Sequence, residues 1–414
     1  MRAIRVGAAL AVGGALLAAS TACSSGGSKG GTDTPGKAAG AGQSSPAAGG
    51  GPASSAAASP SASTAVVDIE PKDGTQGAAL DALKVGVNGG KLTQVSVTDK
   101  SGAAVQGSIS ADGASWVPAA GLSVADSYQV KAQATDANGV STTASSAFTT
   151  LTPSRTSRSQ DNIVTGTTYG VGMIVSVDFG MPIKNKKAAE AGITFEASDG
   201  SPVKGHWMGD NRLDLRPQNF WKPGTTVKVH FRLKNVEVSP GVYGNSDRDE
   251  SFTIGRSQVS VVDAGKHTMT VTTDGQPTQT IPISSGSDEH PTYNGTMVIE
   301  AREGTAHMTS ASVPGLKPGE YDLQVPHSLR LTDSGTYVHG NNWSSHDTFG
   351  SENVSHGCIG LEDAPGDQGG PDTPAAKFYA SSLVGDVVKV VNSKGGAVAA
   401  DNGLSGWNMD WGTW

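Results

Sequence analysis

Apolar and polar residues alternate along much of residues 65–255, and this period of two most constrains the fold. Successive side chains of a strand point to opposite faces, so the alternation predicts strands with one buried face. Asx-Gly pairs, which favour tight hairpins, separate the runs. We therefore predict two immunoglobulin-like β-sandwich modules, at residues 65–153 and 154–255. The supporting positions are Thr93, Val95, Val97, Tyr128, Val130, Ala132, Ala134, Val227, Val229, Phe231 and Leu233, with turns at Asp112-Gly113, Asn138-Gly139 and Asp199-Gly200.

The first 23 residues have the layout of a secretory signal, with Arg2 and Arg5 before an uncharged run that is too short to span a bilayer. Cys23 follows small residues and resembles a bacterial lipoprotein cleavage site, which implies diacylation and attachment to the outer face of the cell membrane. Ser20 stands where such sites usually have Leu, which leaves ordinary signal cleavage as the alternative. Residues 24–64 are almost entirely Gly, Ser, Ala, Pro and Thr and predict a flexible tether.

The chain contains only two cysteines, Cys23 and Cys358, at opposite ends of the sequence. A disulfide between them is not expected, so Cys358 is a single free thiol in an exported protein. Such a thiol is a liability in an oxidising compartment unless the thiol itself is needed. The formal net charge of −8 argues against a nucleic-acid partner, which would favour a basic surface.

A third segment, residues 256–393, is predicted to consist of strands and loops with one short helix. Thr373 can cap this helix, Pro374 suits its first position, and Gly385 would end it. Seven of the nine histidines lie from His267 onward, which places the chemistry in this domain. Residues 394–414 contain three tryptophans, and so large an apolar content predicts a tail that docks on the body of the protein. The predicted fold class is therefore mainly β.

The third domain contains a histidine and a cysteine nineteen positions apart, His339 and Cys358, on what are predicted to be adjacent strand ends. A neighbouring imidazole makes the reactive thiolate accessible near neutral pH. Gly357 would let a substrate carbonyl approach and free the backbone N–H groups around Cys358 for an oxyanion hole. These residues together indicate acyl transfer.

The signature His339, fifteen intervening residues that begin with Gly340, and Ser355-His356-Gly357-Cys358 resembles that of the L,D-transpeptidase family, whose catalytic domain was described first in a Bacillus spore protein. The resemblance extends to landmarks of the mycobacterial members and is strong from about Val261 onward. These landmarks are Tyr321, Ser334-Gly335, Trp343, the segment His290 to Thr296 and the tail Gly406-Trp407-Asn408.

The resemblance implies that Cys358 is the nucleophile and His339 the base, with the Gly340 carbonyl holding the second ring nitrogen. Ser355, His356 and Gly357 would shape the cysteine loop. Tyr321, Ser334 and Gly335 would line the donor pocket, with Trp343 nearby. Gly360 departs from the Asn that is common in the family two residues after the cysteine, which leaves that contribution to substrate orientation in doubt.

The implied reaction joins peptidoglycan stem peptides. Cys358 would attack the L-centre carbonyl of the third residue of a tetrapeptide, release D-alanine and form a thioester that an acceptor amine resolves. The product is a 3→3 cross-link, and no cofactor or metal is expected. The resemblance also implies that β-lactams of the carbapenem type are inhibitors.

Three alternatives remain open from the sequence. A related cysteine enzyme could transfer the acyl group to water or to a protein lysine and would share every proposed site residue. A wall-binding lipoprotein with a decayed enzyme domain is favoured only by Gly360. His339, His346, His356 and Cys358 could instead form a zinc set, although no general base for a hydrolytic zinc site is apparent nearby.

Overall fold

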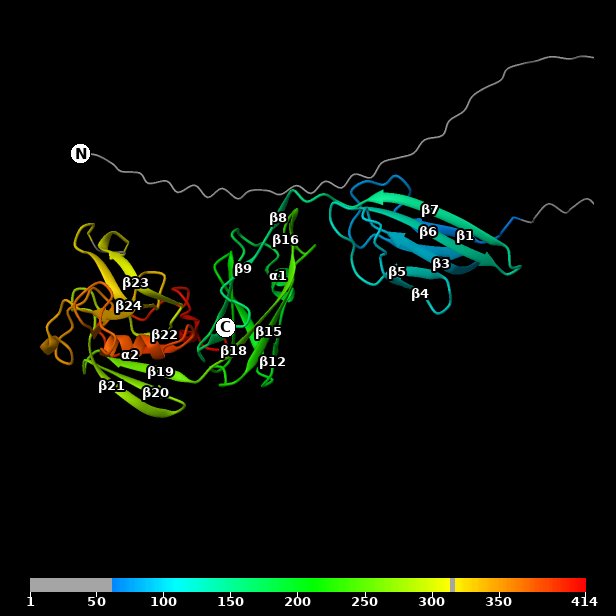
Figure 1. The fold of residues 1–414 in the computed structure, drawn as a ribbon. Coiled ribbons are helices and arrows are strands. Elements are labelled where there is room, and N and C mark those ends of the chain that lie inside the picture. Colours follow the sequence, from blue (N-terminus) through cyan, green and yellow to red (C-terminus); the bar gives the residue numbers. More distant parts are fainter. Residues whose placement is uncertain (1–61, 313–316) are drawn as a thin grey trace, which may run out of the picture. The chain divides into compact units, whose positions relative to one another are not determined.

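The computed structural model describes residues 62–312 and 317–414. The predicted signal, Cys23 and nearly all of the tether lie outside the described residues. Strands dominate and two α-helices are present in the described part, so the predicted mainly β fold class is confirmed (Figure 1). Within these residues no helix has both the length and the apolar character needed to cross a membrane.

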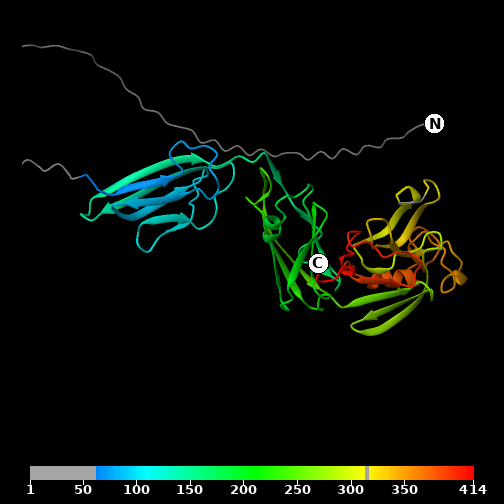
Figure 2. The ribbon, with the colours of Figure 1, turned by 180° about the vertical axis from the view of Figure 1, so that it is seen from behind.

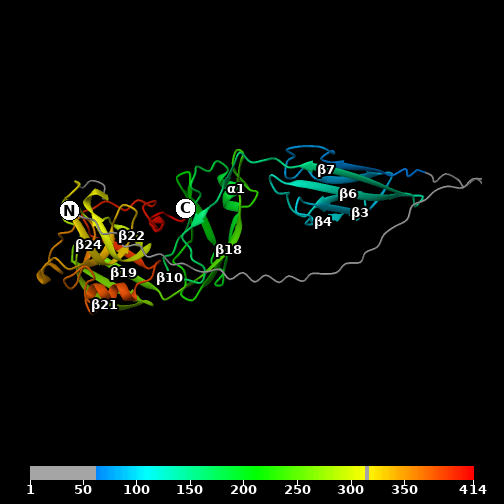
Figure 3. The ribbon, with the colours of Figure 1, turned by 45° about the horizontal axis from the view of Figure 1, so that its top comes forward.

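The first module contains two sheets that enclose one core. One sheet has the order β1-β2-β5-β4 and the other the order β3-β6-β7, with strands β3, β6 and β7 side by side (Figure 3). The predicted positions Tyr128, Val130, Ala132 and Ala134 are all buried, whereas Thr93 is exposed because a register shift between Leu92 and Gln94 turns it outward. The strands are β1 (Val66–Glu70), β2 (Lys84–Asn88), β3 (Gly90–Thr98), β4 (Gly107–Ile109), β5 (Ser115–Pro118), β6 (Ser127–Asp136) and β7 (Ser141–Thr149).

The second module is built from three small sheets, with orders β10-β18-β15-β12, β13-β14-β11-β9 and β16-β17-β8. Its core extends into the third domain, because Val298, Val387 and Leu404 belong to the same buried cluster. The elements are β8 (Arg155–Ser157), β9 (Gln160–Asp161), β10 (Thr168–Tyr169), β11 (Val175–Asp178), α1 (Lys186–Ala191), β12 (Ile193–Ala197), β13 (Val203–Met208), β14 (Arg212–Pro217), β15 (Thr226–Arg232), β16 (Glu237–Ser239), β17 (Val242–Gly244) and β18 (Asp247–Ile254).

The third domain has a nine-stranded sheet in the order β22-β27-β19-β20-β21-β26-β25-β24-β23. A turn at Asp274-Gly275, where both residues have positive φ, joins β20 to β21. The elements are β19 (Gln258–Asp263), β20 (Thr268–Thr273), β21 (Gln276–Ser284), β22 (Gly295–Val298), β23 (Ala301–Thr309), η1 (Ser310–Ser312), β24 (Asp322–Arg330), β25 (Tyr337–Asn341), η2 (His346–Thr348), β26 (Ile359–Glu362), α2 (Pro374–Ser381), β27 (Val387–Val391) and η3 (Gly406–Asn408).

Helix α2 begins as the sequence predicts and ends earlier. The Thr373 side chain accepts a hydrogen bond from the Ala376 N–H at 3.2 Å, and Pro374 occupies the first turn. The expected end at Gly385 is wrong, because Ser382 is already extended and the Leu383 N–H donates to Asp386. Gly385 instead packs against the backbone of Gly170 in the second module.

The C-terminal tail contacts the second module (Figure 2). The Arg216 guanidinium lies 4.2 Å from the ring centre of Trp414 and 4.6 Å from that of Trp407. Each of these indoles also donates a hydrogen bond, Trp407 to the Gly172 carbonyl and Trp414 to the Lys204 carbonyl. Only Trp414 is buried, since Trp407 and Trp411 stay partly exposed.

Candidate active site

Strands β25 and β26 bring the predicted base and nucleophile together. They pair in parallel, with His339 in register with Gly360, and Cys358 lies at the last position before β26 begins. Cys358 stands two positions before Gly360, the partner of His339, so it is on the same face of the sheet, and both side chains line one pocket. The sequence prediction of adjacent strand ends matches this arrangement.

The environment of His339 leaves one ring nitrogen free to accept a proton. Its side chain is buried, and Nδ1 lies 2.9 Å from the Gly340 carbonyl oxygen. A carbonyl only accepts, so Nδ1 carries the hydrogen and Nε2 is left as the acceptor in the neutral ring. Burial lowers the pKa of His339, and the Trp343 ring stacks on it at 5.6 Å between centroids. His339 is therefore a neutral base near pH 7.

Cys358 rests as a thiol rather than as a thiolate. Burial of the sulfur raises the pKa of the Cys358 thiol to about 11, and Sγ lies 3.5 Å from the Gly335 carbonyl oxygen, to which it can donate. The loss of solvation outweighs the stabilising backbone contact from Tyr337, so the thiolate expected from the sequence would form only by proton transfer to His339. Deprotonation then has to accompany attack.

Ser355 shapes the loop that carries Cys358. Its hydroxyl donates to the Cys358 carbonyl at 2.6 Å and accepts from the Gly357 N–H at 3.1 Å. Gly357 has a φ of +114°, which L side chains rarely adopt. Ser355 thus contributes directly to the loop shape that the resemblance assigned to Ser355, His356 and Gly357, and the Gly357 N–H that was expected in an oxyanion hole is already engaged.

A pocket of about 240 Å³ opens over the thiol, lined among others by Tyr321, His339, Trp343, His356 and Cys358. Burial raises the pKa of Tyr321 to about 12, so its hydroxyl keeps its proton and can donate to a ligand. Apolar side chains of Met308, Leu323 and Val325 cover the opposite wall.

A second pocket of about 270 Å³ lies on the other side of the cysteine loop. It is lined by Ser334, Gly335, Gly357, His290 and His356, among others. Tyr321 lines the first pocket, whereas Ser334 and Gly335, which were expected to line the donor pocket with it, line the second. His356 lines both.

Two glycines in the strands beside the site are explained by close neighbours. A Cβ atom on Gly340 would lie 2.0 Å from Oδ2 of Asp363, a buried carboxylate that also pairs with His327 at 2.7 Å. A Cβ on Gly360 would lie 3.3 Å from the Asn341 side chain, so that side chain occupies the adjoining space. Asn341 lines the first pocket.

Sequence reasoning gave no role to several of these residues. His327 was assigned none, and Asp363 was not singled out, because no short motif links residues 36 positions apart. The alternative zinc set does not form in the part of the chain that the structure describes, where His346 pairs with Glu362. The described residues instead bring together His290, Glu320 and His356.

Comparisons with known proteins agree with this architecture. The sequence model of the bacterial Ig domain matches residues 75–237, and that of the L,D-transpeptidase catalytic domain matches residues 257–390. L,D-transpeptidase 2 of Mycobacterium tuberculosis is 30% identical over 347 residues, which cover 83% of this chain and 82% of the relative. L,D-transpeptidase 5 of the same species is 28% identical over 341 residues, which cover 80% and 72%.

Among solved structures, an LD transpeptidase named LdtMt1, in complex with imipenem, is 29% identical, with a TM-score of 0.47 and coverage of 56% of this chain and 97% of that chain. The family assignment depends on the sequence relatives and the catalytic-domain match. The chain belongs to the L,D-transpeptidase family.

Proposed function

We propose that this protein forms 3→3 cross-links in peptidoglycan through a cysteine acyl-enzyme. The observation that carries the proposal is a pocket lined by both Cys358 and His339, a buried histidine whose Nδ1 lies at the Gly340 carbonyl and whose Nε2 is left to accept a proton. A nucleophile, an oriented base and two pockets are the parts that a two-substrate acyl transfer needs.

In the first half-reaction, a tetrapeptide stem binds with the carbonyl of its third residue against Cys358. The Cys358 sulfur forms a bond to this carbonyl carbon while its proton moves to Nε2 of His339. Collapse of the tetrahedral intermediate breaks the peptide bond, and D-alanine leaves with the proton from His339. A thioester remains on Cys358, and a neutral thiol at rest suits this concerted transfer.

In the second half-reaction, the amine of an acceptor stem attacks the thioester. The amine loses a proton to His339, the carbon–sulfur bond breaks, and the proton returns to the thiol. We assign the donor to the Tyr321 pocket and the acceptor to the pocket lined by Ser334 and Gly335, because the two pockets flank the same cysteine loop. A second built pocket favours an amine acceptor over water.

The test is incubation of the protein with purified tetrapeptide muropeptides, followed by mass analysis of the products. Cross-linked dimers that have lost one D-alanine are expected from the native chain, and none from Cys358→Ala at matched folding. Tripeptides alone would show a carboxypeptidase and would contradict the acceptor assignment. Unchanged turnover by Cys358→Ala would contradict the thioester mechanism.

We also propose that Cys23 carries lipid and holds the enzyme on the outer face of the cell membrane, with residues 24–64 as the tether. Support comes from the charged start, the apolar run and the small residues before Cys23. Metabolic labelling with a palmitate analogue should mark the native chain and leave Cys23→Ser unlabelled. Equal labelling of both would overturn the anchor.

A further inference from the structure

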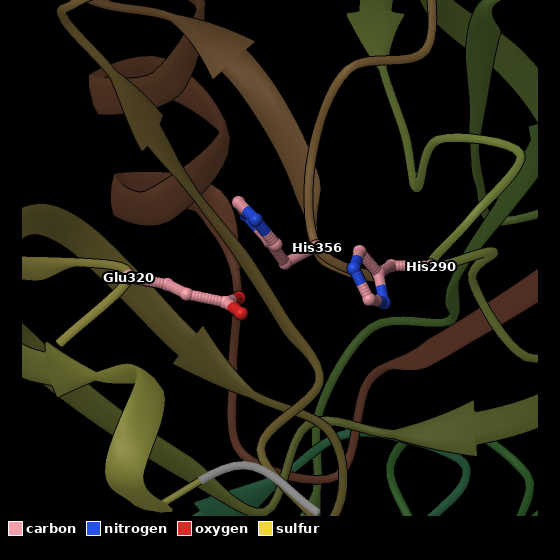
Figure 4. Close-up of side chains that lie close together, drawn as sticks. All are labelled: His290, Glu320 and His356. Carbon is pink, nitrogen blue, oxygen red and sulfur yellow. The ribbon is translucent and has the colours of Figure 1, made fainter. Parts of the chain in front are cut away.

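Three potential metal ligands meet beside the cysteine loop. One nitrogen each of His290 and His356 and a carboxylate oxygen of Glu320 all lie within 4.8 Å of one another (Figure 4). The two imidazole rings are 5.2 Å apart between centroids and tilted by 31°. The three residues come from separate segments, so the cluster depends on the tertiary fold.

The two histidine-bearing segments are fixed to each other by their backbones. The Ser287 N–H donates to the Ser355 carbonyl at 2.8 Å, and the Ser355 N–H donates to the Ser285 carbonyl at 3.0 Å. Between these bonds the chain turns so tightly that a Cβ on Gly286 would lie 2.3 Å from the His290 carbonyl oxygen. The separation of the two backbone segments is therefore set before any ligand arrives, and only the side chains have to adjust.

Glu320 lies in the connection between β23 and β24, two residues before β24 begins. Its N–H donates to the buried Ser310 hydroxyl at 3.0 Å, and the Ser310 N–H donates to the Tyr321 carbonyl at 3.1 Å. The Glu320 side chain is exposed, as is that of His356, so both can rotate. Ligand atoms about 2.1 Å from one ion in a tetrahedron lie about 3.4 Å apart, so closing from 4.8 Å requires at most about 1.4 Å, which such rotations provide.

We propose that His290, Glu320 and His356 bind one Zn²⁺ ion, with its fourth position open to water, and that this ion restrains access to Cys358. Two imidazoles and one carboxylate are a ligand set that zinc accepts, whereas Mg²⁺ and Ca²⁺ require a shell of oxygens. Among the described residues this is the sole group of three or more such side chains whose ligand atoms converge. The ion acts as a regulator, because the proposed acyl transfer has no step that needs it.

The regulatory effect follows from the position of His356. This residue lines both pockets and lies two positions before Cys358. A bound ion would fix its ring and draw Glu320, with the adjacent Tyr321, across the rim of the first pocket. Zinc is therefore expected to slow acylation reversibly. This inhibition rests on the proposed function, whereas the binding of zinc does not depend on it.

Zinc binding is tested by titration calorimetry on the untagged full chain carrying Cys23→Ser and Cys358→Ser, so that no thiol can serve as a ligand. One Zn²⁺ per chain is expected, with no saturable binding of Mg²⁺. Adding His290→Ala or Glu320→Gln should weaken binding at least tenfold. His307→Ala is the matched control, since His307 is exposed beside the carboxylate of Asp322 and should bind as the parent does. Absence of saturable binding, or equal affinity after His290→Ala, would overturn the site.

The regulatory effect is tested on chains that keep both cysteines. Zn²⁺ should inhibit turnover, and His290→Ala should raise the half-inhibiting concentration at least tenfold relative to its own zinc-free rate. Inhibition that is unchanged in His290→Ala would assign the effect to the thiol and overturn the regulation. If the native chain shows no cross-linking while the cysteine-free chain binds zinc, the proposed function fails and the metal site stands.

Discussion

Asn402 and Ser334 are joined by two hydrogen bonds that run in opposite directions. Asn402 Oδ1 accepts from the Ser334 N–H at 3.0 Å, and Asn402 Nδ2 donates to the Ser334 hydroxyl at 2.8 Å. The next residue, Gly335, has its carbonyl oxygen 3.5 Å from the Cys358 sulfur. The C-terminal tail therefore fixes a loop that contacts the proposed nucleophile.

Replacing Asn402 by Ala should lower the rate of acylation more than it lowers stability. Two neutral hydrogen bonds contribute about 1–3 kcal/mol together, so the melting temperature should fall modestly. The loop that ends at Gly335 would then position the sulfur less well. Acylation kinetics and thermal unfolding measure the two effects. Asn211→Ala, an exposed position in the second module, should change neither, and an unaltered acylation rate in Asn402→Ala would show that the tail is only structural.

His339→Ala should lose far more activity than His356→Ala at equal stability. Only His339 has the fixed Nδ1 and free Nε2 of a general base, and a positioned base contributes about 10²–10⁴-fold. Turnover of muropeptides in zinc-free buffer, with melting temperatures as a check on folding, makes the comparison. A reversed order of losses would transfer the base to His356.

Acylation should remain fast below pH 6.5. The reaction needs neutral His339, and burial lowers the pKa of this group, so the acid limb of the rate profile lies below the usual histidine value of about 6.5. Between that value and the lowered pKa, the unfolded chain binds a proton that the native chain does not, so His339 makes stability fall as pH falls through this window. The acylation rate measured from pH 4 to 8 checks the sign. An acid limb of the rate profile above pH 6.5 would mean that a charged partner stabilises the His339 imidazolium.

Trp414→Ala should destabilise the protein by about 3–5 kcal/mol, the usual cost of truncating a buried aromatic side chain. The indole is buried, stacks on Arg216 and donates to the Lys204 carbonyl at 2.8 Å. Chemical denaturation followed by fluorescence gives the change. Trp343→Ala serves as the comparison because its side chain is half exposed and should leave stability within about 1 kcal/mol. Equal losses of stability in Trp414→Ala and Trp343→Ala would show that the Trp414 contacts do not hold the tail on the second module.

A carbapenem should acylate the protein once, at Cys358. Its strained ring presents a carbonyl to the sulfur, and attack opens the ring as the ring nitrogen takes the proton through His339. Intact-protein mass spectrometry should show one added drug mass, and peptide mapping should place it between Ser355 and Leu361. Cys358→Ala should gain none. A folded, reduced native chain that gains no mass would favour a decayed enzyme domain.

Local sequence patterns predicted much of the fold. Alternation identified the buried faces at Tyr128 to Ala134 and Val227 to Leu233, and the capping residues Thr373 and Pro374 located the start of α2. The pattern failed at Thr93, where a register shift broke the period, and at Gly385, where packing on Gly170 gave the glycine another reason to be present. Contacts of this kind depend on segments that are distant in the sequence, so a local pattern cannot predict them.

The proposed site, like the fold, was predicted in part from local sequence patterns. The sequence prediction that His339 and Cys358 lie near adjacent strands matches the structure, because His339 is on β25 and Cys358 directly precedes its parallel partner β26. The division between the Tyr321 pocket and the Ser334 pocket could not be read from the sequence, since it depends on how the cysteine loop lies between them. The raised pKa of Cys358 was likewise missed, because desolvation comes from the whole surrounding fold.

The contact between Asn341 and Gly360 links two positions that would otherwise vary independently. A side chain at position 360 needs the space that the Asn341 side chain fills, 3.3 Å from the Cβ it would have. The amide that relatives are expected to carry on β26 is thus replaced by one on β25, across a single pair of parallel strands. A Cβ at position 360 would be tighter against Asn341 than most such contacts, so Asn at 360 should be accommodated more easily when residue 341 is smaller.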